Sequence, residues 1–254
     1  MFKTLRTEID GSIGRLELNR PDKLNPLSSE ALEEIALAAR YFDEETEAKV
    51  VIVSGAGRAF SAGADLKSFG GKQDKSTHEI AEIGRRMAES LESMRALAIA
   101  RIQGWCVGGG LVLAAACDLR IASVEAKFSI PEVDLGIPLA WGGIPRLVRE
   151  LGPALTKELV LTCRPFDANE AKAAGFLNRV VPADVLDAEV DALAASLAAK
   201  AGHALFSTKR HVNAVTDQMV GTGRSWADAD GLVTAFVDEE CGQIRRDYLK
   251  KRSS

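Results

Sequence analysis

The sequence is poor in the side chains that bind metals and in aromatic residues. It holds three histidines and four cysteines among 254 residues, and only 6% of its residues are aromatic. The histidines, His78, His203 and His211, show no metal-ligand spacing, so we expect core or surface roles for them rather than zinc binding. The cysteines are scattered without close pairing, and with no export signal this predicts reduced thiols.

Long hydrophobic runs and a strong excess of one charge are also missing. The longest apolar run, around Leu111–Cys117, is far shorter than the ~20 residues of a membrane helix, so no membrane partner is expected. The net charge is −4 and no basic stripe with interleaved aromatic residues occurs, which argues against nucleic acid as a partner. The start of the chain is charged throughout and lacks the apolar middle of a secretory signal, so we expect a cytoplasmic protein.

The sequence does have the composition of an ordinary globular protein, with 46% hydrophobic and 27% charged residues. Apolar positions alternate on both sides of Asp10-Gly11, which predicts a hairpin whose second strand is Ile13–Leu18. The run Val50–Ser54 has no polar alternation and is typical of a strand buried on both faces. Helical patterns dominate the later part. We therefore predict an α/β core over residues 1–200 and a helical region over residues 201–254.

The last residues are locally basic, with Arg245, Arg246, Lys250, Lys251 and Arg252 close together. Such a cluster is typical of a solvated helix end. The alternative interpretation is a contact with phosphates of a ligand or of a neighbouring subunit.

Three consecutive glycines, Gly108–Gly110, stand directly before an apolar run with helical character. A tight turn, close backbone packing, or exposed amides that hold a negative group would each explain them. The dinucleotide fingerprint does not fit, because Leu113 stands where its third glycine is needed, and no glycine run continues into Gly-Lys-Ser/Thr. The segment AFSAG has Ala59 where a nucleophile elbow needs glycine, which argues against Ser61 as a hydrolase nucleophile.

A second glycine-containing loop, FSAGADL, also follows a buried strand. Two such loops can direct two backbone amides at one oxygen, which is the arrangement of an oxyanion hole. Losing one donor of such a hole typically costs ~2.7–4 kcal/mol of transition-state stabilisation. Small residues are needed in both loops because the reacting carbonyl must approach the backbone itself.

Five segments, in order along the chain, resemble the enoyl-CoA hydratase/isomerase (crotonase) superfamily, and the resemblance covers most of the sequence. They are NRPDKLNPL, AFSAGADLK, GWCVGGGLVLAAACDLRIAS, FSIPEVDLGIPLAWGGIPRLVRELG and DANEAKAAGFLNRVV. The resemblance implies an α/β fold of the ClpP/crotonase type, a spiral of ββα units with the acyl-CoA site in residues 1–200. It also implies that residues 201–254 cover the site and drive assembly into a homotrimer, or into a hexamer built as a dimer of trimers.

The same resemblance implies roles for individual residues. The backbone N–H groups of Ala64 and Gly109 would form the oxyanion hole for the thioester carbonyl of an acyl-CoA, with Glu132 as the acid and base. Coenzyme A would be part of the substrate, so no separate cofactor and no metal are expected. The path of coenzyme A and pantetheine would include Lys23, Leu24, Ala62, Asp65 and Leu66. Further substrate contacts are implied for Ala64, Gly108, Gly109, Val112, Pro131, Leu139 and Trp141.

Some of these residues have simpler interpretations that stay open. Asp65 would equally suit a helix cap, and Lys23 a solvated charge in a loop. Trp141 stands where relatives commonly carry a small residue, and its side chain either narrows the acyl pocket or packs in the core. If it lines the pocket, Trp141→Ala should admit longer acyl groups.

Hydratases of this family carry two glutamates, and the sequence matches only one of them. The first position is Val112, whereas the second is Glu132 at the expected spacing. Adding water requires an activated water and a proton delivered to carbon, tasks that two carboxyl groups share in the hydratases. Asp134 follows two residues later, but on an extended segment it would face the same side only with regular pairing, so no catalytic role is assigned to it.

A double-bond shift needs only one base, which moves a proton from one carbon to another through an enolate. Burial would raise the pKa of Glu132 toward the working pH. The pattern therefore favours isomerisation of 3-enoyl-CoA to 2-enoyl-CoA. Two alternatives remain: an enoyl-CoA hydratase that uses Glu132 with another group or a substrate-held water, and a non-catalytic protein that binds acyl-CoA.

Overall fold

The computed structural model describes residues 2–65, 75–225 and 227–253. The strands are β1 (Leu5–Asp10), β2 (Ile13–Leu18), β3 (Val50–Gly55), β4 (Leu97–Ile102), β5 (Trp105–Val107), β6 (Leu119–Ser123), β7 (Lys127–Ser129), β8 (Phe166–Asp167) and β9 (Arg179–Val181). The α-helices are α1 (Ser29–Glu44), α2 (Thr77–Ser93), α3 (Gly109–Ala115), α4 (Gly143–Leu151), α5 (Pro153–Thr162), α6 (Ala168–Ala173), α7 (Leu186–Ala198), α8 (Gly202–Val220), α9 (Asp228–Val237) and α10 (Glu239–Ser253). Short 3₁₀ turns are η1 (Pro21–Lys23), η3 (Ala183–Val185) and η4 (Thr222–Ser225).

A six-stranded sheet of order β1-β2-β3-β4-β6-β9 forms the centre of the molecule, and a three-stranded sheet contains β5, β7 and β8. Strands β1 and β2 form an antiparallel hairpin through Gly11, which has a φ of +53° that glycine adopts easily, so the predicted hairpin is confirmed. The remaining neighbours in the larger sheet are parallel. Parallel strands need long crossover connections, and here these contain the helices that cover the sheet.

Helices cover both faces of the larger sheet. The main core contains Val51 and Val53 of β3 together with buried side chains of α1, α2 and α3. On the opposite face, Val50 and Ile52 pack in a second apolar cluster with residues of α7. The central strand β3 is therefore buried on both faces, as its unbroken apolar run predicts.

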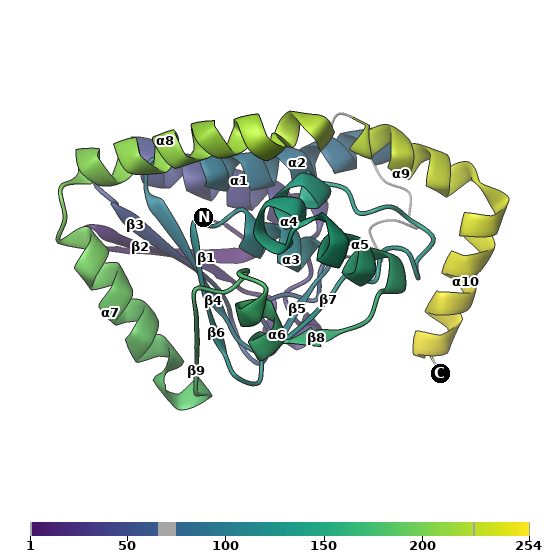
Figure 1. Ribbon diagram of the computed structural model, residues 1–254, viewed down its shortest axis with the longest axis horizontal. Helices are drawn as coiled ribbons and strands as arrows, with labels where there is room; N and C mark the ends of the chain where they lie inside the picture. Colours follow the sequence, from purple (N-terminus) through teal and green to yellow (C-terminus); the bar gives the residue numbers. More distant parts are fainter. Residues whose placement is uncertain (1, 66–74, 226, 254) are drawn as a thin grey trace.

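The C-terminal part described in residues 202–225 and 227–253 is helical. Figure 1 shows α8 crossing the top of the molecule, with α9 and α10 continuing toward the end where the C-terminus lies. Among the described residues, no helix combines the length and the apolar character needed to cross a bilayer. The division at residue 200 and the role of the helical region in assembly stay predictions.

Helix α8 is attached to the core through a buried cation. The Lys209 ammonium donates to the Asp118 carboxylate at 2.8 Å and to the carbonyl oxygens of Leu91 and Ala96 at 3.3 and 3.0 Å. Asp118 also accepts a 2.7 Å bond from the N–H of Ala98 in β4. These partners belong to α2 and to the segments next to β4 and β6, so the ion pair fixes α8 against α2 and the sheet.

Candidate active site

Three parallel segments place the candidate catalytic groups next to one another. Ser61 forms a parallel bridge with Cys106 of β5, and Cys106 pairs with Phe128 of β7. Ala64 follows Ser61 by three residues, and Gly109 follows Cys106 by three residues. Because parallel segments end at the same edge, the chain turns that follow them meet at one place. The loop after β7 brings Glu132 to that edge.

The three glycines, Gly108–Gly110, each accommodate a different neighbour. A Cβ on the first glycine would lie 2.3 Å from the Glu132 Oε1, and one on the second would lie 2.2 Å from the Trp141 indole. A Cβ on the third would lie 2.8 Å from the side chain of Ser61. Gly108 also has a φ of +49° and a ψ of −115°, which glycine adopts most readily. The run therefore combines two of its possible explanations, close packing and a turn that glycine permits.

The amides of Ala64 and Gly109 lie at the junction of the two glycine-containing loops. Gly109 is the first residue of α3, and the first N–H groups of a helix have no partner within it. Ala64 bridges with Leu27, but the bonds of this bridge run from Leu27 N–H to Gly63 O and from Asp65 N–H to Leu27 O. The Ala64 N–H therefore takes no part in the bridge.

The two loops are also in direct contact. A Cβ on Gly63, the residue before Ala64, would lie 2.6 Å from the Val107 carbonyl oxygen and 3.5 Å from the Gly109 nitrogen. Val107 N–H donates to the Ser61 carbonyl oxygen at 3.0 Å, which fixes the spacing between the loops.

The Glu132 carboxyl group is buried at the same place. Glu132 is the first residue of a run of turns after β7, and it is 8% exposed. The Oε2 atom is buried and has no hydrogen-bond partner among the described residues. Burial raises the pKa of Glu132 to about 7. A carboxyl group with such a pKa exists in both protonation states near neutral pH, as a group that both accepts and returns a proton requires.

Asp134 lies outside this arrangement. Residues 132–136 form turns, with the Leu135 N–H donating to the carbonyl oxygens of Pro131 and Glu132. The condition considered for Asp134, an extended segment with regular pairing, is therefore not met, and Asp134 is exposed. This placement is consistent with the expectation that Asp134 has no catalytic role.

A cavity of about 30 Å³ lies between Glu132 and the two loops that contain Ala64 and Gly109. Its described lining is Ala64, Gly109, Glu132, Ile137, Pro138, Leu139, Ala140, Trp141 and Leu232. Larger hollows lie elsewhere, but that of 410 Å³ on the outer side of the sheet is lined by charges paired with each other, such as Arg101 with Asp187. The small cavity is the candidate site because the unpaired carboxyl group and the two glycine-containing loops meet there.

The structure brings five of the sequence-predicted site residues to this cavity: Ala64, Gly109, Glu132, Leu139 and Trp141. Gly108 lies against the Glu132 carboxyl group, and Pro131 is the residue directly before Glu132. Val112 is fully buried, and its side chain lies beside Leu139 and Gly143 rather than among the described residues that line the cavity.

The residues predicted along the coenzyme A path lie in adjoining loops. Lys23 is exposed at the end of η1, and the Ala62 N–H donates to the Leu24 carbonyl oxygen at 2.8 Å. Asp65 accepts a 3.3 Å bond from the guanidinium of Arg20, a pairing that sequence analysis did not anticipate. Leu66 lies outside the described residues, so its proposed contact stays a prediction.

Asn25 organises the loop before the cavity and was not among the site residues predicted from the sequence. The buried Asn25 amide donates to the carbonyl oxygens of Ala56 and Ala59 at 2.9 Å, and its Oδ1 accepts from the Arg20 N–H. The Ser61 hydroxyl donates to the Asn25 carbonyl oxygen at 2.8 Å and is fully buried. Ser61 is thus a packing residue in this loop. An asparagine between two prolines is a turn signal, but the carbonyl groups that accept from its amide belong to residues far along the chain.

Leu232 of α9 and the apolar residues Ile137, Pro138 and Ala140 were also missed as lining residues. Helical spacing shows that Leu232 belongs to an apolar face, but it does not show which part of the molecule that face covers. The pairing of α9 with α2 places it at the cavity.

Comparisons with known proteins agree with this architecture. The family model described as enoyl-CoA hydratase/isomerase matches residues 8–254. A probable enoyl-CoA hydratase of Mycobacterium tuberculosis is 33% identical over 254 residues, covering 99% of this chain and 97% of the relative. A peroxisomal Delta(3,5)-Delta(2,4)-dienoyl-CoA isomerase of Arabidopsis thaliana is 36% identical over 224 residues, covering 82% of this chain and 81% of the relative.

The crystal structure of an enoyl-CoA hydratase from Mycobacterium avium subsp. paratuberculosis has the same fold. It superposes with a TM-score of 0.86 at 28% identity, covering 96% of this chain and 98% of that one. The predicted α/β fold of the crotonase type is therefore confirmed. With the family model matching nearly the whole length, this chain belongs to the enoyl-CoA hydratase/isomerase family.

Proposed function

We propose that this protein isomerises 3-enoyl-CoA thioesters to 2-enoyl-CoA thioesters, with Glu132 as both base and acid. One observation carries the proposal: Glu132 is the only carboxylate among the described residues that line the cavity. Its buried, unpaired Oε2 atom and its raised pKa suit a group that exchanges a proton with carbon.

The reaction then needs two proton transfers. The Glu132 carboxylate removes a proton from C2 of the 3-enoyl group, and the electron pair of that C–H bond moves toward the thioester carbonyl to form a dienolate. The N–H groups of Ala64 and Gly109 donate to the enolate oxygen and stabilise its charge. The Glu132 carboxylic acid next returns the proton to C4, while the double bond forms between C2 and C3.

Coenzyme A would enter along the loops that hold Lys23, Leu24, Ala62 and Asp65. The exposed ammonium of Lys23 suits a phosphate of the nucleotide end, and the small Ala62 leaves the backbone accessible to the pantetheine. In this proposal coenzyme A is the carrier part of the substrate, and the acid-base chemistry requires no separate cofactor.

Hydration of 2-enoyl-CoA is the second candidate, because the M. tuberculosis relative carries a hydratase name. In the family hydratases a second glutamate assists, whereas Val112 stands at that position here. Val112 is apolar and fully buried, so it neither orients water nor donates a proton. Isomerisation, which needs one carboxyl group, fits the described lining better.

An assay with two substrates separates the candidates. Purified protein is mixed with 3-enoyl-CoA or with 2-enoyl-CoA while the absorbance of the conjugated thioester is followed. An increase with 3-enoyl-CoA that exceeds any loss with 2-enoyl-CoA supports the isomerase. The reverse result establishes a hydratase, and activity on neither substrate with retained acyl-CoA affinity identifies a binding protein.

Val112→Glu tests whether the absence of a second carboxyl group disfavours hydration in this protein. If the missing carboxyl group limits the addition of water, this variant should hydrate 2-enoyl-CoA faster than the wild type. Val112→Gln is the matched control, since it adds a side chain of similar size without the acid. Equal hydration rates in two folded variants that bind acyl-CoA would contradict the explanation.

A further inference from the structure

The Trp141 indole fills a slot between two helix backbones beside the proposed oxyanion hole. A Cβ on Gly84 of α2 would lie 2.3 Å from the pyrrole part of the indole. On the other side, a Cβ on Gly109 of α3 would lie 2.2 Å from its benzene part. Both glycines are thus required for the indole to lie where it does, and the side chain, only 5% exposed, forms part of the cavity lining.

The backbone that carries the indole is held from two directions. Trp141 has a φ of +62°, a left-handed conformation that is uncommon for a bulky residue and persists only where neighbours stabilise it. The Arg146 guanidinium donates to the Trp141 and Gly142 carbonyl oxygens at 3.4 and 3.1 Å. The Asp228 carboxylate accepts a 2.8 Å bond from the Gly142 N–H.

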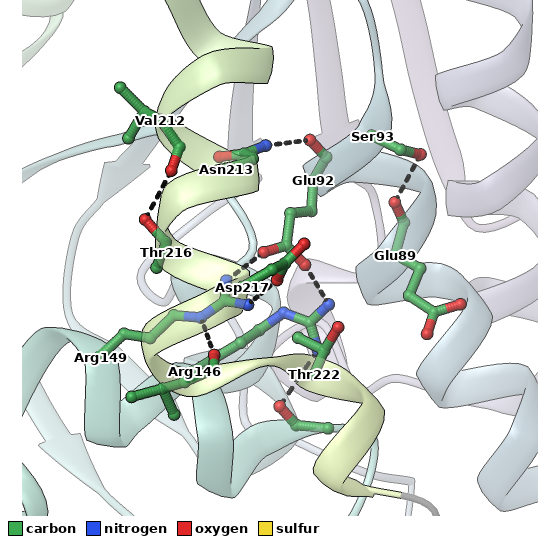
Figure 2. A network of polar contacts seen from close by, with 12 residues as sticks. Glu89, Glu92, Ser93, Arg146, Arg149, Val212, Asn213, Thr216, Asp217 and Thr222 are labelled. Atoms are coloured by element: carbon green, nitrogen blue, oxygen red, sulfur yellow. Dashed lines mark hydrogen bonds and ion pairs between the residues drawn. The ribbon is translucent and has the colours of Figure 1, made fainter.

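The arginine is itself fixed by an ion-pair network. Figure 2 shows Arg146 and Arg149 of α4 converging on Glu92 of α2, and Arg149 also pairs with Asp217 of α8. Arg146 is only 1% exposed. The turn that bears Trp141 is therefore connected to α2, α4 and α9, and the indole has little freedom to move aside for a ligand.

We propose that Trp141 limits the length of the acyl group, so that the protein acts on short-chain acyl-CoA thioesters. The inference rests on the proposed function, since it assumes that the thioester oxygen lies at the Ala64 and Gly109 amides. From that position the acyl chain enters a cavity of about 30 Å³ with the indole as one wall. Such a volume holds only about two water molecules. A longer chain would have to displace the indole from its slot.

The test is the dependence of affinity on acyl length, measured by calorimetry with saturated acetyl-, butanoyl-, octanoyl- and dodecanoyl-CoA. Saturated thioesters are not isomerised or hydrated, so the result does not depend on which reaction the protein catalyses. Each methylene buried in an apolar pocket should raise affinity about fourfold. The wild type should gain affinity up to the butanoyl chain and none beyond it.

Trp141→Gly is the informative variant, because glycine adopts the left-handed backbone of this position and removes the whole indole. The ratio of dodecanoyl-CoA to butanoyl-CoA affinity should rise at least about tenfold, while affinity for free coenzyme A stays unchanged. Trp141→Phe, which keeps an aromatic ring of smaller size, should shift the ratio in the same direction by less, and it decides the question if the glycine variant does not fold.

Three results would overturn the inference. A wild-type affinity that rises evenly to dodecanoyl-CoA, or an unchanged length profile in a folded Trp141 variant, would remove Trp141 as the limit while leaving the proposed function intact. A wild type that binds none of the four thioesters would overturn the proposed function as well.

Discussion

At the scale of the residue, the proposed isomerisation depends on the protonation state of Glu132. Its pKa of about 7 arises from burial, which disfavours the charged carboxylate. The base in the first proton transfer is the ionised form. We therefore expect kcat/KM for 3-enoyl-CoA to rise with pH, to reach half its plateau near pH 7 and to stay level above it. A profile that is flat from pH 5 to pH 9, or that falls through pH 7, would contradict this assignment.

The same burial of the Glu132 carboxylate should lower the free energy of unfolding at neutral pH. Its pKa is raised from 4.5 to about 7 in the folded protein, so folding is unaffected by this group below pH 4.5 and is progressively destabilised between pH 4.5 and 7. The full effect, about 3 kcal/mol from a shift of this size, applies above pH 7. Glu132→Gln should thus gain stability over the wild type as pH rises from 4.5 to 8, measured by urea unfolding. An equal stability difference at the two pH values would contradict the buried, unpaired carboxyl group.

At the scale of the element, the buried Lys209–Asp118 ion pair is one of the contacts that attach α8 to the core. Lys209→Ala leaves Asp118 buried beside the carbonyl groups that the ammonium satisfied, a situation that commonly costs about 3–5 kcal/mol. Lys157→Ala, on the exposed side of α5, is the control and should change stability by less than about 0.5 kcal/mol. The free energy of unfolding measures both, and similar losses in the two variants would contradict the role given to the pair.

Individual elements were largely predictable from local patterns. The hairpin at Asp10-Gly11 and the doubly buried strand β3 follow from turn chemistry and from apolar periodicity, which act within a few residues. The extended conformation weighed for Asp134 is not adopted, because turns stabilised by the Pro131 and Glu132 carbonyl groups replace regular pairing there. A short segment next to a proline has too little hydrophobic periodicity to distinguish a series of turns from an extended strand.

At the scale of the whole molecule, the candidate site was predictable only in part. The two glycine-containing loops and Glu132 are visible as motifs in the sequence. The slot for the Trp141 indole between Gly84 and Gly109 could not be predicted from the sequence, because it depends on the packing of α2 against α3. Taken alone, Gly84 resembles any other glycine in a helix. The contribution of Leu232 likewise depends on where the C-terminal helices fold back.

Assembly is a further prediction at this scale. The helices of the C-terminal region expose large apolar side chains, among them Met219 at 72% and Val237 at 81%. Exposed apolar side chains on these helices are available for an interface between subunits, which would bury them. We expect a homotrimer or a dimer of trimers, so light scattering coupled to size-exclusion chromatography should give three or six times the monomer mass at micromolar concentration. A monomeric mass under these conditions would contradict this expectation.

The proposed mechanism depends on a single carboxyl group, that of Glu132, to carry out both proton transfers. The most direct measurement is the kcat for isomerisation of butenoyl-CoA with its double bond at C3, compared between the wild type and Glu132→Gln. Glutamine keeps the size of the side chain but cannot exchange a proton. A loss of about 10²–10⁴-fold in kcat with little change in affinity for butanoyl-CoA is the predicted result. A glutamine variant that retains kcat within threefold of the wild type would contradict the central claim.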